Sequence, residues 1–124
     1  MEQVVTYFFD TYALVEIVKG NLAYGKYAEA KAHTSLFNLY ELYVQVLKSY
    51  GEEMAKKEFD NFKRILIEVK DIHIFLAAAF KTGDKKTHFS YTDALGYAIA
   101  EAEGLRFVTG DNEFRNLPNV QFVR

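Results

Sequence analysis

Apolar runs alternate with polar, turn-forming segments along the chain, and this pattern predicts short strands and helices in succession. Residues 3–9 form a β-branched and aromatic run, typical of a buried strand that ends at Asp10. Asp10 or Thr11 is suited to cap a helix over residues 11–19, which Gly20 would end. The pattern therefore predicts a strand, an acidic residue and a helix without a linker between them.

The strongest helical pattern covers residues 35–50, with Ser35 as the cap and Gly51 as the stop. Its apolar side chains surround most of the helix instead of forming one stripe, which predicts burial on two sides, the second partly by a partner. The pattern over residues 52–65 predicts a more amphipathic helix, and the apolar residues 66–69 are compatible with a strand.

The remaining segments complete an alternation of helices with short strands. A short helix over residues 22–27 and a short strand over residues 31–34 precede the long helix. Beyond it, the pattern predicts helices over residues 71–81 and 90–103 and strands over residues 105–108 and 120–123. Such alternation indicates βαβ units, and hence a three-layer α/β domain with a central parallel sheet flanked by helices.

Composition restricts the classes of function without selecting one. A chain of 124 residues, half of them hydrophobic, is expected to form a single domain with one core. The absence of cysteine excludes disulfides, thiolate metal sites and a cysteine nucleophile, and suits the interior of a cell. No apolar stretch reaches the roughly 18 residues of a membrane span, and no leader is evident. The net charge of −2 gives no overall attraction for nucleic acid.

Acidic residues stand where ligands bind in open parallel sheets, beyond the carboxyl ends of strands. Asp10 directly follows the first predicted strand, and Asp111 follows the strand over residues 105–108 after a Thr-Gly step. Asp93 lies in the first turn of an alanine-rich helix, and Glu41 lies in the helix that is apolar nearly all round. Each acid also has an ordinary interpretation as a cap, a turn residue or a solvated side chain.

Convergence of the four acids would change this interpretation. Four carboxylates in one place repel one another unless a cation neutralises them or some become protonated. Carboxylate oxygens suit Mg²⁺ or Mn²⁺ and not zinc. Such ions activate a water and stabilise the charge on a phosphodiester during in-line attack. The hypothesis is therefore a metal site for phosphodiester hydrolysis, provided that the four acids meet.

Four short segments carry these acids, and they are distinctive as a set. They are residues 8–14 (FFDTYAL), 38–42 (NLYEL), 90–98 (SYTDALGYA) and 104–114 (GLRFVTGDNEF). Together they resemble the PIN-domain ribonucleases, especially the compact VapC-type toxins of toxin–antitoxin pairs, and the resemblance extends over nearly the whole chain. It implies one PIN-like domain over residues 1–124.

The resemblance also implies an activity, a cofactor and partners. It implies an endoribonuclease that depends on Mg²⁺ or Mn²⁺, with an RNA substrate, a homodimeric state, an antitoxin protein as partner and a cytoplasmic location. The acidic set that would act in catalysis and bind metal comprises Asp10, Glu41, Asp93 and Asp111. By the same resemblance, Thr11 and Thr109 would support the site by hydrogen bonding.

Two positions depart from the resemblance. Many relatives have Ser or Asn where Tyr12 stands, which bears on how substrate fits, and several have Asp where Glu113 stands, a candidate outer ligand.

The charge of the chain is compatible with RNA once the acids are set apart. Removing four negative charges from −2 leaves +2. Four basic residues near the proposed site in sequence are candidates for contact with RNA phosphates: Lys81, Lys85, Lys86 and Arg115.

Three other functions compete with this interpretation. A phosphoryl-transfer enzyme with an aspartyl nucleophile at Asp10 would carry a second acid two residues later, where Tyr12 stands. A receiver-like signalling module would need a lysine after its last strand, and none is evident. A catalytically inactive PIN-like domain that binds a protein or regulates it remains the alternative from outside catalysis. Metal-dependent cleavage, or its absence, separates these functions.

Overall fold

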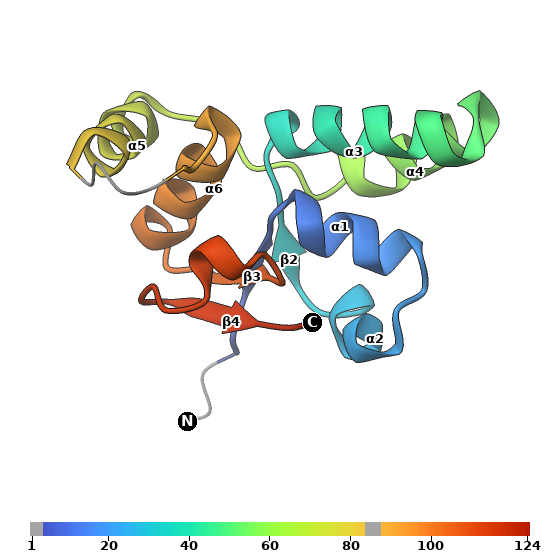
Figure 1. The fold of residues 1–124 in the computed structure, drawn as a ribbon, viewed down its shortest axis with the longest axis horizontal. Helices are drawn as coiled ribbons and strands as arrows, with labels where there is room; N and C mark the ends of the chain where they lie inside the picture. Colours follow the sequence, from blue (N-terminus) through green and yellow to red (C-terminus); the bar gives the residue numbers. More distant parts are fainter. Residues whose placement is uncertain (1–3, 84–87) are drawn as a thin grey trace.

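Four parallel strands form the centre of the protein in a computed structural model, which describes residues 4–83 and 88–124 (Figure 1). The strands are β1 (Tyr7–Phe9), β2 (Ala32–His33), β3 (Arg106–Thr109) and β4 (Val120–Phe122). They lie in the order β2-β1-β3-β4, and every pairing between neighbours is parallel. The predicted α/β class with a central parallel sheet is confirmed.

The strand order reverses between β1 and β3. The chain passes from β1 to β2 on one side, and β3 then pairs with the other side of β1. Phe9 at the end of β1 is paired with Val108, so the carboxyl ends of the two strands lie side by side. Open parallel sheets bind ligands at such a reversal, because the loops that follow the two strands diverge there.

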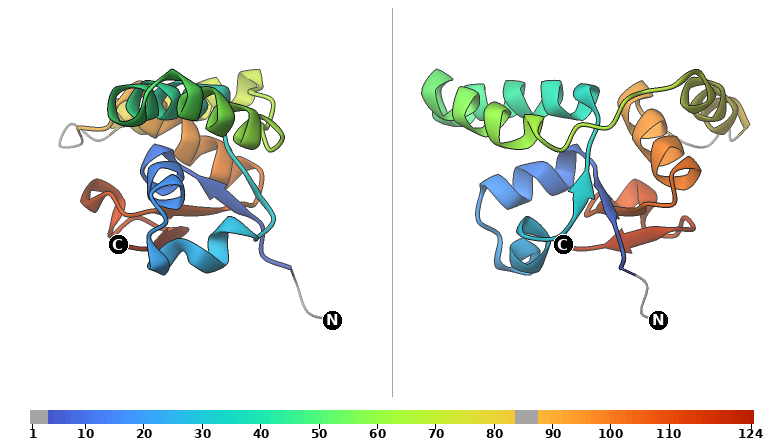
Figure 2. Two further views of the ribbon diagram at one scale, coloured as in Figure 1. Left: turned by 90° about the vertical axis from the view of Figure 1, so that its right-hand side faces the viewer. Right: turned by 180° about the vertical axis from the view of Figure 1, so that it is seen from behind.

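Helices cover both faces of the sheet. They are α1 (Thr11–Val18), α2 (Gly25–Ala28), α3 (Leu36–Tyr50), α4 (Glu52–Lys63), α5 (Asp71–Gly83) and α6 (Tyr91–Ala102), with short 3₁₀ helices η1 (Leu22–Tyr24) and η2 (Asn112–Phe114). The pair α3 and α4 packs above α1, and the pair α5 and α6 lies on the other side of the sheet (Figures 1 and 2). No described helix is long and apolar enough to cross a membrane.

Two hydrophobic cores occupy the two faces, because successive residues of a strand point in opposite directions. Phe8 and Phe107 pack with α5, α6 and Phe114 on one face. Phe9 and Val108 pack with α1, α3 and α4 on the other. The strands are buried on both sides, which explains why their sequences are continuous apolar runs, and the predicted three-layer arrangement is confirmed.

Two strand predictions differ from the structure. Residues 66–69 are not a strand, since only Leu66 forms an isolated parallel bridge, with Thr34. The neighbouring β2 is only two residues long and offers too little backbone for a further strand. The predicted first strand is shorter, because Val4 and Val5 are 81% and 52% exposed and β1 begins at Tyr7; Gln3 lies outside the described residues.

The long helix α3 has the predicted ends but only part of the predicted burial. Ser35 caps it by accepting a hydrogen bond from the Asn38 N–H, and Gly51 ends it in a left-handed conformation with φ of 92°. Helix α4 covers part of its second face. Tyr40 and Tyr50, however, remain 66% and 55% exposed. The apolar surface of α3 is thus only partly buried by the chain itself.

Candidate functional site

The structure brings the four predicted acids to one pocket of about 510 Å³. Each comes from a different element. Asp10 follows β1, Glu41 lies on α3, Asp93 lies in the first turn of α6, and Asp111 follows β3. This acid pocket, named here for those four residues, therefore lies at the reversal of strand order.

Three of the four carboxylates also act as local helix caps. Each accepts a backbone hydrogen bond that would otherwise lack a partner at a helix start. The bonds run from Ala13 N to Asp10 Oδ1 (2.9 Å), from Ser90 N to Asp93 Oδ2 (3.1 Å) and from Glu113 N to Asp111 Oδ1 (3.0 Å). The capping interpretation and the shared pocket are thus both correct, because the caps fix the direction of these side chains.

A buried chain of hydrogen bonds holds the fourth acid. The Thr11 hydroxyl donates to Glu41 Oε1 at 2.6 Å, and Asn38 Nδ2 donates to Thr11 Oγ1 at 3.1 Å. Ser35 in turn donates to Asn38 Oδ1 at 2.6 Å. Asn38 is only 1% exposed and was not anticipated as part of the site. Its signal in the sequence is a polar residue one helical turn before Glu41 within an apolar helix.

The pocket carries uncompensated negative charge. The pKa of Asp10 is raised to about 7, mainly by burial. Hydrogen bonds with Thr109 and with the Ala13 N–H oppose this rise, and the charges of Asp93 and Asp111 add to it. Burial also raises the pKa of Asp93, with Asp111 and Glu41 adding to the effect. With a pKa of about 7, the Asp10 carboxyl is present in both its neutral and its charged form near neutral pH.

The donor set suits a divalent cation in its chemistry but is not gathered around one point. Carboxylate oxygens are the ligands that Mg²⁺ and Mn²⁺ prefer, and a cation would stabilise the charged form of Asp10, which burial and the neighbouring carboxylates disfavour. Within residues 4–83 and 88–124, however, no three acidic or histidine side chains are placed so that they could hold a metal ion. Each of the four carboxylates instead accepts a hydrogen bond from a nearby donor.

The turn that carries Asp111 is tightly packed. Thr109 is fully buried, and its Oγ1 accepts the Asp111 N–H at 3.0 Å. A Cβ atom on Gly110 would lie 2.2 Å from Tyr12 Cε1 and 2.4 Å from the Val123 carbonyl oxygen. Only glycine fits there, so the aromatic ring of Tyr12, which also lines the acid pocket, packs directly against this turn.

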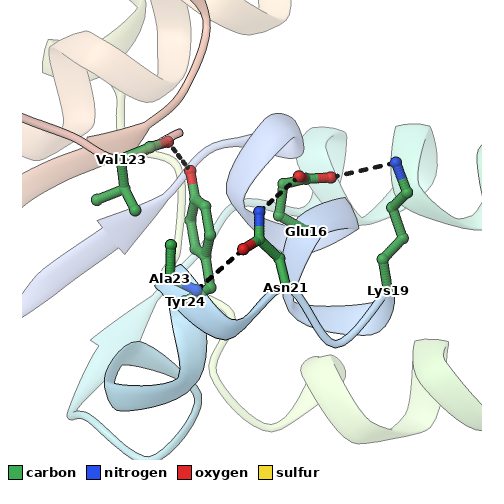
Figure 3. Close-up of polar contacts among 6 residues, drawn as sticks. All are labelled: Glu16, Lys19, Asn21, Ala23, Tyr24 and Val123. Carbon is green, nitrogen blue, oxygen red and sulfur yellow. Dashed lines mark hydrogen bonds and ion pairs between the residues drawn. The ribbon is translucent and has the colours of Figure 1, made fainter.

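The C-terminal strand region supports the same turn. The Val123 N–H donates to the Thr109 carbonyl at 2.8 Å. The carbonyl oxygen of Val123 accepts a 2.6 Å hydrogen bond from the hydroxyl group of the buried Tyr24 (Figure 3). Asn21, which accepts the Ala23 N–H, caps the 3₁₀ helix that presents Tyr24 (Figure 3). Residues far apart in the sequence therefore brace the turn that carries Asp111.

Among the described residues, the other polar candidates lie outside the acid pocket. Glu113 is exposed and is not among the residues that line the pocket. Lys81 donates to the Phe89 carbonyl at 2.7 Å and lies over the Tyr91 ring, and Arg115 lies over the Phe122 ring. Lys85 and Lys86 lie outside the described residues. Contact of these basic residues with RNA phosphates stays a prediction.

Comparison with protein families agrees with this fold and these motifs. The PIN domain matches residues 7–120, which is nearly the whole chain. The chain belongs to the PIN-domain family. Comparison of this PIN domain with curated proteins finds no match.

Solved structures similar to this PIN domain include VapC toxins. VapC20 of Mycobacterium tuberculosis, a Sarcin-Ricin loop cleaving toxin, has a TM-score of 0.78 at 16% identity over 95% of this chain and 99% of its own. VapBC2 from Rickettsia felis, bound to a DNA fragment from its promoter, has a TM-score of 0.77 at 23% identity, with 97% and 100% covered. A toxin–antitoxin complex from Klebsiella pneumoniae has a TM-score of 0.74 at 22% identity, with 93% and 95% covered. At these sequence identities the likeness shows a shared fold and nothing more.

Proposed function

We propose that this PIN domain is a metal-dependent endoribonuclease and the toxin of a type II toxin–antitoxin pair. The observation that carries the proposal is the meeting of four carboxylates in one pocket at the strand reversal of a PIN fold. The mycobacterial neighbour VapC20 is a Sarcin-Ricin loop cleaving toxin, which supports RNA as the substrate.

The proposed roles follow from the position of each side chain. Asp10, Glu41, Asp93 and Asp111 would hold the cation through their carboxylate oxygens. When bound, Mg²⁺ or Mn²⁺ would activate a water and stabilise the charge that develops on the phosphodiester. Thr11 would keep Glu41 turned into the pocket through its 2.6 Å hydrogen bond, and Thr109 would fix the backbone at Asp111.

Protein partners form part of the proposal. Toxin–antitoxin complexes among the structural neighbours support an antitoxin partner. A homodimeric state and a cytoplasmic setting belong to the same proposal. Exposed apolar side chains add support, because patches of this kind mark interaction surfaces. They include Phe37 on α3 and Ile74 and Phe75 on α5, which are 47%, 49% and 66% exposed.

The test is cleavage of structured RNAs by the purified full chain, with Mg²⁺, with Mn²⁺ and with a chelator. Asp93→Asn should abolish cleavage, because the amide removes a negative ligand but keeps an oxygen to accept the Ser90 N–H. Asp71→Asn is the matched control, since Asp71 occupies the first turn of α5, is exposed and lies outside the pocket.

Two results would contradict the proposal. Cleavage that persists without metal and in Asp93→Asn would exclude the proposed chemistry. A complete lack of cleavage under every metal condition would favour the inactive protein-binding alternative.

A further inference from the structure

Three polar residues follow one another at intervals of three along the start of α3. They are Ser35, Asn38 and Glu41, and this spacing places them along one side of the helix. The Ser35 hydroxyl donates to Asn38 Oδ1 at 2.6 Å, and its oxygen accepts the Asn38 backbone N–H at 3.2 Å. The helix cap therefore holds the amide oxygen of Asn38, so that the NH₂ group of the same amide faces away from Ser35.

The hydrogen bonds that continue from Asn38 to Glu41 have a fixed direction. The NH₂ group of Asn38 donates to Thr11 Oγ1 at 3.1 Å, and this oxygen lies 2.6 Å from Glu41 Oε1. A carboxylate oxygen only accepts, and a hydroxyl group has a single proton to donate. With the Asn38 amide reversed, Thr11 would face two acceptors with one proton, and one of the two contacts would become repulsive. Asn38 thus directs the Thr11 proton to Glu41.

We propose that Asn38 is a positioning residue, which acts through Thr11 to hold the Glu41 carboxylate in place to bind the cation. The proposal rests on the proposed metal-dependent ribonuclease and adds to it a residue that does not line the acid pocket. Solvent cannot take over this role, because Asn38 is only 1% exposed. Removing a hydrogen bond that orients a metal ligand typically weakens metal binding roughly tenfold to a hundredfold.

The test is the affinity of the purified full chain for Mn²⁺, measured by isothermal titration calorimetry without any RNA. Asn38→Leu keeps a similar side-chain volume but has no donor, and it should raise the Kd for Mn²⁺ roughly tenfold to a hundredfold. Asn38→Ala introduces no new atoms into the buried site. It should weaken Mn²⁺ binding in the same direction, and it replaces Asn38→Leu in the test if the leucine variant does not fold.

A double-mutant cycle separates action through Thr11 from a general loss of packing. Thr11→Val removes the hydroxyl through which Asn38 is proposed to act, so this variant should itself raise the Kd for Mn²⁺. Adding Asn38→Leu to Thr11→Val should then leave the Kd unchanged. A residue that merely packs would weaken Mn²⁺ binding to the same extent in both backgrounds.

The matched control is Tyr97→Phe. Tyr97 lies on α6 outside the acid pocket, is 4% exposed, and donates a 2.6 Å hydrogen bond to the Pro118 carbonyl. Loss of this bond should lower stability in a denaturant titration, as the loss of Asn38 should, but it should leave the Kd for Mn²⁺ unchanged.

Three results would overturn the positioning role. The first is a wild-type Kd for Mn²⁺ in a folded Asn38→Leu or Asn38→Ala variant. The second is an equal fold-change on Asn38→Leu with and without the Thr11 hydroxyl. The third is equal weakening by Tyr97→Phe, which would mean that Mn²⁺ affinity simply follows stability.

The two proposals fail in different ways. A chain that binds Mn²⁺ with the expected dependence on Asn38 and Thr11 but cuts no RNA would refute the ribonuclease and keep the positioning role. A metal-dependent nuclease whose Asn38→Leu variant binds Mn²⁺ like the wild type would refute the positioning role alone. A wild-type chain that binds no Mn²⁺ would refute both.

Discussion

Raising the pH of the metal-free protein from about 5 to about 8 is expected to destabilise it through Asp10. The pKa of this carboxyl is about 7 in the folded chain, against an ordinary value of 3.8. The folded state therefore binds the proton more tightly than the unfolded state does. The stability that the neutral carboxyl contributes is complete below the lower pKa and is lost as the pH rises through the higher one.

The size of the effect follows from the separation of the two pKa values. They differ by about three pH units, and each unit corresponds to about 1.4 kcal/mol, so the full change is about 4 kcal/mol. The part that falls between pH 5 and pH 8 is about 3 kcal/mol. That is a large share of the free energy of unfolding of a small domain.

Denaturant unfolding followed by circular dichroism measures this change, with a chelator present at every pH. Asp10→Asn is the reference, because asparagine also caps helices by accepting the Ala13 N–H and does not titrate. The free energy of unfolding of the wild type, minus that of the variant, should fall by about 3 kcal/mol between pH 5 and pH 8. Two curves that run parallel across this range would refute the reasoning that burial and neighbouring charge disfavour ionised Asp10.

Two further substitutions test the packing around the acid pocket. Gly110→Ala should lower the free energy of unfolding by about 1 to 3 kcal/mol, because its Cβ would lie 2.4 Å from the Val123 carbonyl oxygen. Gly25→Ala, where nothing lies within 4 Å, should cause no such loss in the same denaturant titration. Thr11→Val should cost about 1 to 3 kcal/mol, because it removes the donor to Glu41 and the acceptor of Asn38, whereas Thr11→Ser should restore most of that stability. A Thr11→Val variant as stable as the wild type would contradict this reasoning, because valine keeps the methyl group of threonine and lacks only the hydroxyl.

The sequence predicted the buried elements of the fold well, for a physical reason. Runs such as Phe8-Phe9 and Phe107-Val108 are apolar on both faces because helices cover both faces of the sheet. Helix ends were predictable where a local signal exists, as with Ser35 and Gly51 around α3. Residues 66–69 had the same apolar character, but a strand also needs a neighbour of sufficient length, which no local pattern reveals.

The sequence predicts the acidic residues of the candidate site but not the residues that hold them in place. Asp10 and Asp111 come directly after strands that the sequence pattern predicts. Because the carboxyl ends of parallel strands lie at the same edge of a sheet, the pattern also predicts that these two side chains lie close together. Asn38 and Tyr24 act through long-range hydrogen bonds, to Thr11 and to Val123, that depend on how the elements pack. The raised pKa of Asp10 likewise comes from burial and from neighbours on other elements, which sequence spacing alone does not provide.

The strand order also determines when the acid pocket can exist during synthesis on the ribosome. β1 gains β2 early, but its other neighbour, β3, is made only after helices α3 to α6. A nascent chain that already contains Asp10 and Glu41 lacks Asp93 and Asp111, and the edge of β1 stays unpaired until β3 emerges. The complete set of carboxylates is thus assembled only after Asp111 has left the ribosomal tunnel.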